Sequence, residues 1–172
     1  MILTVKKIHR KLRDYNNIKG LYQRAFPKEE RIPMGILQIM SGFKIFDALA
    51  FYDGERLCGF SYSIVREKAV LLMYLAVNDN MRSKGYGSRI LTYLKKRYSD
   101  KPVILEVEEP DDSADNADQR QSRIAFYKRN GFYETNEYVK IRNVRYEIMS
   151  TEDGFTAEEF RELQKAIFRR KS

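Results

Sequence analysis

The sequence has one cysteine, one histidine and no tryptophan. The lone Cys58 excludes an intramolecular disulfide and any metal site built from several thiolates. The lone His9 excludes a multi-histidine site, so we expect no bound metal. No apolar run approaches the roughly 20 residues that span a bilayer, so we expect no membrane partner. Because free thiols are usual in a reducing cytosol, the expected location is cytoplasmic.

Acidic residues are outnumbered: 24 Asp and Glu stand against 32 Lys and Arg, which gives a net charge of +8. Such a balance suggests an anionic partner, either nucleic acid, a membrane surface or a phosphorylated cofactor. The charge is uneven, because residues 1–31 hold nine basic and three acidic residues, whereas 106–118 hold seven acidic and no basic ones. A nucleic-acid binder would more simply carry one continuous basic face, so RNA or ribosome binding is kept only as an alternative.

The length of 172 residues favours one domain, and no linker rich in Pro, Gly or Ser divides the chain. We expect a domain over residues 1–150 and a C-terminal helical extension over 151–172 that packs on the domain or on a partner subunit. The extension carries a capping box at Thr156 and Glu159, followed by an apolar stripe of Phe160, Leu163 and Ile167. Periodicity predicts strands over 2–8, 46–52, 56–65, 69–77, 103–107, 132–141 and 144–149, and helices over 13–26, from 32, over 83–98, up to about 130 and over 156–170.

A glycine-containing turn follows the buried strand 69–77 and precedes a helix. Glycines let a phosphate approach the backbone, and the first N–H groups of a helix have no partner within it and favour negative charge. Arg82 and Lys84 add positive charge. The segment is therefore chemically suited to a pyrophosphate, although an ordinary strand-to-helix turn would carry the same pattern.

A second motif, Phe126-Tyr127-Lys128-Arg129-Asn130-Gly131-Phe132, places a tyrosine near the end of a helix that breaks at Gly131. Together with Arg82 to Gly87, this segment resembles the GCN5-related N-acetyltransferase (GNAT) family across roughly residues 2–150. The resemblance implies an α/β fold of the α+β kind, with a mixed, mostly antiparallel sheet of about seven strands flanked by helices. It also implies direct transfer of an acetyl group from acetyl-CoA to a primary amine.

The resemblance assigns a set of residues to acetyl-CoA. The backbone of Leu75 and Val77 is implied to pair with the pantetheine arm, which leaves their side chains free to pack in the core. The residues implied to wrap the pyrophosphate are Arg82, Ser83, Lys84, Gly85, Tyr86, Gly87 and Ser88.

Two residues are implied to move protons. Tyr127 matches the family position that protonates the leaving thiolate, and a phenol with a pKa near 10 is protonated at neutral pH. Leu105-Glu106-Val107 matches the strand that supplies a general base in ribosomal-protein N-terminal acetyltransferases, so Glu106 is the candidate base. Strand alternation puts Glu108 on the same face, as a second candidate base or a substrate anchor. The family's asparagine seven residues before the tyrosine is replaced by Arg120, and Asn116 is the candidate substitute.

The acceptor amine is expected to be a small cationic molecule or a peptide, because the acidic 108–118 loop would attract positive charge. Glu29 and Glu30, in the connection between the first two helices, are further candidates for contacts with the amine. A GNAT-like module that holds coenzyme A without catalysis is the alternative within the fold. The expected assembly is a monomer or a homodimer.

Overall fold

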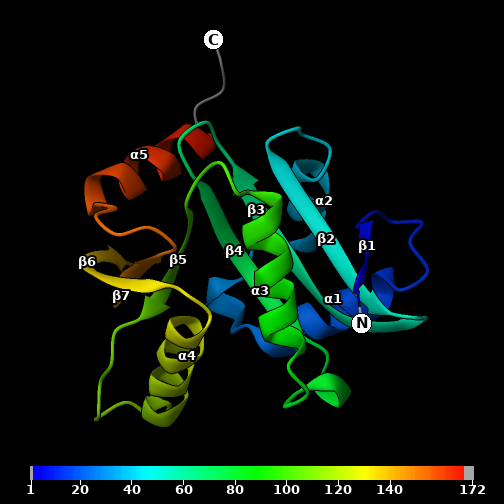
Figure 1. Cartoon of the computed structure of the whole chain (residues 1–172), viewed down its shortest axis with the longest axis horizontal. Coiled ribbons are helices and arrows are strands. Elements are labelled where there is room, and N and C mark those ends of the chain that lie inside the picture. Colours follow the sequence, from blue (N-terminus) through cyan, green and yellow to red (C-terminus); the bar gives the residue numbers. More distant parts are fainter. Residues whose placement is uncertain (1, 169–172) are drawn as a thin grey trace. The chain divides into compact units, whose positions relative to one another are not determined.

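The computed structural model describes residues 2–168, with side chains up to residue 165 (Figure 1). The predicted end of the last helix at residues 169–170 and the predicted apolar contact of Ile167 lie outside this description. Residues 2–65 and 72–93 form one compact unit, and residues 66–71 and 94–168 form a second one. The predicted boundary at residue 150 stays a prediction.

The seven strands follow the order β1-β2-β3-β4-β5-β7-β6. The β1–β2, β2–β3, β5–β7 and β6–β7 pairs are antiparallel, while β4 and β5 are parallel. This confirms the predicted mixed, mostly antiparallel sheet. None of the described helices is long and apolar enough to cross a membrane.

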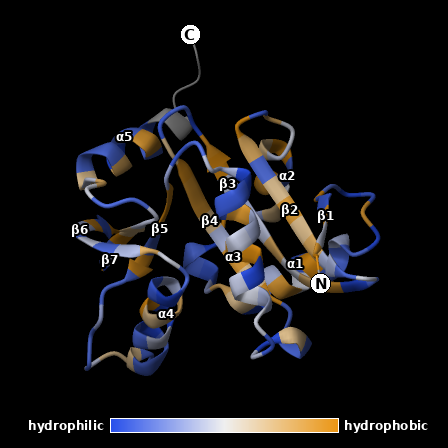
Figure 2. Cartoon of the chain, in the orientation of Figure 1, coloured by the Kyte–Doolittle hydropathy of each residue, from blue (hydrophilic) through white to orange (hydrophobic). Residues whose placement is uncertain are grey.

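The first unit contains three strands and most of a fourth, with the helices that lie between them or follow the fourth. Its strands are β1 (Thr4–Lys7), β2 (Phe46–Asp53), β3 (Arg56–Val65) and β4 (Val70–Val77) from Leu72 on; its helices are α1 (Tyr15–Ala25), η1 (Lys28–Glu30), α2 (Met34–Met40), η2 (Asp79–Met81) and the first part of α3 (Tyr86–Arg97). The predicted hairpin at Asp53-Gly54 is confirmed, since Asp53 pairs with Arg56 and Gly54 has a φ of 59°. Figure 2 shows β4 as a largely hydrophobic strand, consistent with the continuous apolar pattern of its sequence.

An aromatic cluster joins α1 to β3 and β4. The ring of Tyr22 lies 5.0 Å from that of Tyr74 and 6.2 Å from that of Phe60, edge to face, and Phe26 lies 4.9 Å from Tyr74. Each such pair contributes roughly 0.5–1.5 kcal/mol beyond the burial of its area. The hydroxyl of Tyr74 donates to the carbonyl of Glu30 at 2.7 Å, so the cluster also fixes η1.

The second unit contains β5 (Val103–Glu108), β6 (Tyr133–Ile141), β7 (Val144–Ser150), α4 (Ala117–Arg129) and α5 (Ala157–Phe168). The first residues of β4 belong to it, because Val70 and Leu71 pair with Val103 and Ile104. In Figure 1, α4 and α5 lie on either side of β6 and β7, and both helices contact β6. The predicted capping box of α5 is confirmed: the Glu159 N–H donates to Thr156 Oγ1 at 3.2 Å, and the Thr156 N–H donates to Glu159 Oε2 at 2.9 Å.

Candidate active site

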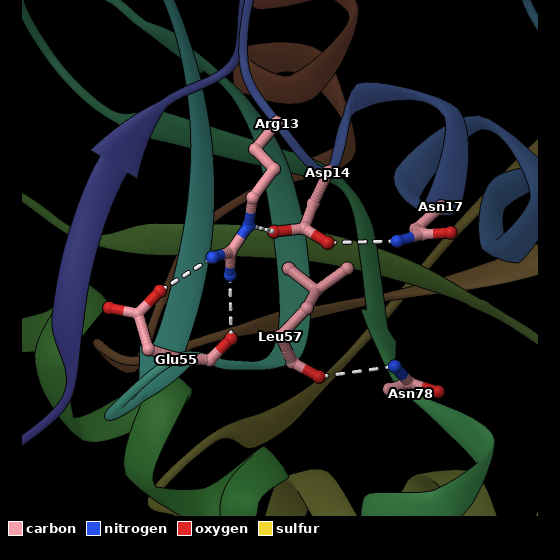
Figure 3. A network of polar contacts seen from close by, with 6 residues as sticks. All are labelled: Arg13, Asp14, Asn17, Glu55, Leu57 and Asn78. Carbon is pink, nitrogen blue, oxygen red and sulfur yellow. Dashed lines mark hydrogen bonds and ion pairs between the residues drawn. The ribbon is translucent and has the colours of Figure 1, made fainter.

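The end of β4 is bound tightly to β3 immediately before the phosphate turn. The Asn78 N–H donates to the Cys58 carbonyl at 2.7 Å, and Asn78 Nδ2 donates to the Leu57 carbonyl at 3.1 Å (Figure 3). A Cβ on Gly59 would lie 2.3 Å from the carbonyl oxygen of Ala76, so only glycine lets the two strands come this close. Sequence reasoning overlooked Gly59, although a glycine within a strand is a known sign of close backbone approach.

The start of β3 is fixed as well. Arg13 Nη1 contacts Glu55 Oε2 at 2.6 Å and Nη2 donates to the Glu55 carbonyl at 2.8 Å, while Nε donates to Asp14 (Figure 3). The residues before α1 thus hold the hairpin that carries Leu57, the partner of Asn78. The start of β3 is therefore restrained through Arg13, and the end of β4, the strand that carries Leu75 and Val77, is restrained through Asn78.

The phosphate turn differs in one respect from its prediction. The helix was predicted to begin at residue 83, but α3 begins at Tyr86, because Ser83 and Gly85 have φ values of 59° and 77°. These left-handed residues end the irregular segment and turn the chain into the helix. A Cβ on Gly85 would meet no atom within 4 Å, so the space beside the turn is open.

Charged and polar contacts hold the turn in place. Asp79 forms ion pairs with Arg82 at 2.9 Å and with Arg24 at 3.0 Å, and Lys84 Nζ donates to the Asn80 carbonyl at 3.0 Å. Both partners of the Asp79–Arg82 ion pair are exposed, so the pair contributes little to the stability of the fold and serves to orient Arg82. The turn, the amides that begin α3 and two basic side chains fit a diphosphate. A diphosphate accepts hydrogen bonds from several N–H donors, and the basic side chains can neutralise its negative charge.

Tyr86 connects the start of α3 to the β2–β3 hairpin. Its hydroxyl donates to Asp53 Oδ2 at 2.5 Å, and the guanidinium of Arg89 lies 5.1 Å from its ring. The hydrogen bond to the carboxylate raises the pKa of Tyr86. The side chain of Tyr86, a predicted cofactor residue, therefore binds Asp53, and its backbone N–H is the group suited to a phosphate.

Glu106 lies in the middle of β5, opposite Ile148 of β7. Its neighbours Leu105 and Val107 are buried on the other face of the strand, while the Glu106 side chain is half-buried with Oε2 covered from solvent. A partly desolvated carboxylate on a rigid strand is the type of group that serves as a general base.

Glu108 is engaged by the beginning of α4. Its carboxylate accepts from Asn116 Nδ2 at 3.0 Å and pairs with Arg120 at 3.3 Å, and Arg120 also donates to Asn116 Oδ1 at 2.8 Å. Arg120, which stands where the family has asparagine, and Asn116, its candidate substitute, therefore both bind Glu108 and anchor the acidic loop to β5. The predicted role of Glu108 in catalysis or amine binding stays a prediction.

Tyr127 lies near the end of α4, which closes as predicted at Gly131 with a φ of 84° and a Phe132 N–H bond to the Tyr127 carbonyl at 3.1 Å. Its ring contacts Phe126 at 5.3 Å and Phe132 at 5.5 Å. Burial raises the pKa of Tyr127 to about 12, so the phenol is protonated at neutral pH. Within the described chain its hydroxyl forms no hydrogen bond, which leaves that proton available for a ligand.

The predicted site residues are divided between the two units. Leu75, Val77 and the whole phosphate turn lie in the first unit with Glu29 and Glu30, whereas Glu106, Glu108 and Tyr127 lie in the second. Glu29 is exposed and Glu30 half-buried, and both stand on η1. Leu75 and Val77 are half-buried and alternate with the buried Tyr74 and Ala76.

Comparison with known proteins gives one family and a consistent fold. Residues 46–134, about half of the chain, match the acetyltransferase (GNAT) domain family and include the phosphate turn, Glu106 and Tyr127. Comparison with curated proteins finds no match.

Solved structures are similar over most of the chain. An acetyltransferase of the GNAT family from Bacteroides thetaiotaomicron is 23% identical with a TM-score of 0.76, and the match covers 95% of this chain and 94% of that one. An aminoglycoside 6'-N-acetyltransferase in complex with coenzyme A is 17% identical with a TM-score of 0.63, covering 86% and 95%. Naa50 of Arabidopsis thaliana, in complex with the bisubstrate analogue CoA-Ac-MVNAL, is 19% identical with a TM-score of 0.61, covering 88% and 99%. At these identities the structures establish the fold, and the domain match establishes the family: the chain belongs to the GNAT N-acetyltransferases.

Proposed function

We propose that this protein transfers an acetyl group from acetyl-CoA directly to the primary amine of a small cationic molecule or peptide. The observation that carries the proposal is the phosphate turn, whose left-handed residues, open space and helix N-terminus fit the cofactor's diphosphate. Acetyl-CoA supplies the acetyl thioester. Structural relatives whose names include coenzyme A or a bisubstrate analogue support the same cofactor.

In this proposal the chain's own residues bind, orient and move protons. Backbone amides of residues 85–88, with Arg82 and Lys84, hold the diphosphate, and the backbone of Leu75 and Val77 orients the pantetheine arm. Glu106 takes a proton from the incoming ammonium, directly or through a water, because only the neutral amine is a nucleophile. Tyr127 holds its proton at Oη and gives it to the departing thiolate, whose conjugate thiol has a pKa of roughly 8.5.

The acidic loop supports a cationic acceptor. Arg120 and Arg145 neutralise Glu108 and Glu109, but Asp111, Asp112, Asp115 and Asp118 form no ion pair within the described chain. Two bonds from Ser113 lower the pKa of Asp111, so it stays ionised at neutral pH. Four carboxylates that form no ion pair within the described chain would raise the local concentration of a cation. The aminoglycoside and peptide relatives are in keeping with acceptors of this kind.

The test is an amine-panel assay for free thiol. We expect steady thiol release with at least one cationic amine, and a fall of 10-fold or more in kcat for Tyr127→Phe and for Glu106→Gln, since general acid or base catalysis typically contributes 10²–10⁴-fold. Tyr93→Phe, whose ring packs on Phe51, and Glu152→Gln, an exposed acid, are the matched controls. Full kcat in Tyr127→Phe would refute the role of Tyr127 as general acid, and full kcat in Glu106→Gln would refute the role of Glu106 as general base. The absence of thiol release with every amine would refute the transfer itself.

A further inference from the structure

A groove of about 760 Å³ runs beside β6 in the second unit, and none of the residues assigned to catalysis or to acetyl-CoA lines it. We name it the β6 groove, and its lining is acidic and aromatic: Glu109, Pro110, Lys128, Phe132, Tyr133, Glu134, Asn136, Tyr138, Glu147 and Asp153. All of these residues belong to one unit, so the groove is a property of that unit alone.

The groove exists because β6 leaves its ladder in the middle. The register between β6 and β7 shifts between Glu134 and Tyr138, and Asn136 has a φ of 57°. Thr135 Oγ1 donates to the Ile148 carbonyl at 2.7 Å, which fixes the bulged segment against β7. A bulge interrupts the ladder and re-aims side chains, and here Glu147 of the partner strand lines the groove beside the bulged segment.

Glu147 is a buried carboxylate that forms no ion pair within the described chain, although the charge of Lys128 acts on it and lowers its pKa in part. Its side chain is 3% exposed, and within the described chain its sole hydrogen-bond donor is the Asn136 N–H, at a long 3.3 Å from Oε1. Burial and the neighbouring carboxylates of Glu134 and Glu109 raise its pKa. A buried carboxylate is ordinarily paired with a cation or several donors, so the site is incomplete as it stands.

The basic side chains near Glu147 already have other partners. Lys128 forms an ion pair with Glu134, and Arg145 pairs with Glu109 at 3.1 Å while stacking 4.0 Å from the ring of Tyr138. Among the described residues, the groove therefore contains one buried carboxylate with no ion pair of its own, a further exposed acid at Asp153, and three aromatic side chains. An ammonium group on an aliphatic stem meets both features, because the charge pairs with a carboxylate and the stem covers the rings.

The groove is distinct from the proposed catalytic base. On β7, Ile148 pairs with Glu106, whereas Glu147 pairs with Val107. Since successive side chains of a strand point to opposite faces, Glu147 and Glu106 are on opposite faces of these strands. A cation on Glu147 would therefore not be the amine that Glu106 deprotonates.

We propose that the β6 groove is a second binding site, for a small aliphatic primary ammonium, with Glu147 as its counter-charge and Tyr133 and Tyr138 against its stem. An N-acetylated amine has lost the positive charge, so the groove accepts the free amine and rejects its acetylated form. The proposal concerns binding alone and holds whether or not the protein acetylates the same amine.

The test is a titration with 1,4-diaminobutane, in the absence of acetyl-CoA, followed by amide chemical shifts in heteronuclear NMR spectra. We expect saturable shifts at Asn136, Tyr138 and Glu147, an affinity at least 10-fold lower in Glu147→Gln, and shifts retained in the exposed-surface control Glu158→Gln. Glu106→Gln is expected to keep these shifts, which separates the groove from the acceptor site. N,N'-diacetyl-1,4-diaminobutane should cause none.

A second variant guards against a folding defect in Glu147→Gln. Tyr133 is 56% exposed, so Tyr133→Ala should fold normally, and we expect it to weaken binding several-fold. The proposal is overturned if diaminobutane shifts no amide in the groove, if both variants bind as the wild type does, or if the diacetyl compound binds equally well.

Discussion

Gly59→Ala is the substitution for which the structure predicts the sharpest effect. The new Cβ would lie 2.3 Å from the Ala76 carbonyl oxygen, 3.1 Å from Ile90 Cδ1 and 3.2 Å from Val77 Cα. Two of these three atoms are backbone, so β3 and β4 must separate by about 1 Å to restore an ordinary contact. Forcing an extra carbon into a packed core costs roughly 1–3 kcal/mol, which corresponds to a Tm lower by about 3–10 °C in a chain of this size.

The same displacement has a functional consequence. It moves the backbone of Ala76 and Val77, on which the proposed contact with the pantetheine arm depends, so the KM for acetyl-CoA should rise at least several-fold. The KM for the amine should change little.

Thermal melting and steady-state kinetics with acetyl-CoA as the varied substrate measure both effects. Gly35→Ala on α2 is the matched control, because its Cβ would meet no atom within 4 Å and a helical Gly-to-Ala change is ordinarily neutral or stabilising. A Gly59→Ala variant as stable as the wild type would refute the packing argument. A destabilised variant with an unchanged KM for acetyl-CoA would refute the role given to the β4 backbone.

Three further predictions concern electrostatics. The charges that face Glu147 are those of Glu134, Glu109 and Lys128, and the pKa of Glu147 is raised. The folded state therefore binds the proton of Glu147 more tightly than the unfolded state does. The stability that this group contributes is present at low pH and is lost as the pH rises above about 4.5. Glu147→Gln should not show this loss, so in urea unfolding its free energy of unfolding relative to the wild type should increase from pH 4 to pH 7. A difference between the two proteins that stays constant with pH would contradict this prediction. Tyr86→Phe removes the bond to Asp53 and should raise the KM for acetyl-CoA more than it changes kcat, whereas an unchanged KM would show that α3 begins correctly without that bond. The four aspartates of the acidic loop are Asp111, Asp112, Asp115 and Asp118. Their replacement by asparagine should raise the KM for cationic amines at low salt and leave the KM for acetyl-CoA unchanged. KM values for all amines equal to those of the wild type would show that the loop has no part in acceptor binding.

The sequence predicted those features whose signals are local. Apolar periodicity placed the strands and helices, Asp53-Gly54 placed a hairpin, and Gly131 placed the end of α4, because each depends on residues close together in the chain. The start of α3 was placed three residues early, since Ser83 adopts a left-handed conformation that its residue type does not announce.

Contacts between distant residues were beyond local reasoning. The pairing of Glu108 with Arg120 depends on how the acidic loop folds back onto β5, and the bond from Tyr86 to Asp53 joins residues 33 positions apart. Glu147 resembles an ordinary polar position of an alternating strand in the sequence. Its place in the β6 groove goes with the register shift between Glu134 and Tyr138 and the left-handed Asn136, which lie on another strand.

The central claim is that the turn before α3 and the first amides of that helix hold the diphosphate of the cofactor. The most direct measurement is a titration of the ¹⁵N-labelled protein with coenzyme A, observed at the amides of Gly85, Tyr86, Gly87 and Ser88. We predict that these four amides show the largest shifts and saturate together, and that 4'-phosphopantetheine, which lacks the diphosphate, leaves them nearly unmoved. Coenzyme A that fails to bind, or that binds while these four amides stay in place, would contradict the account.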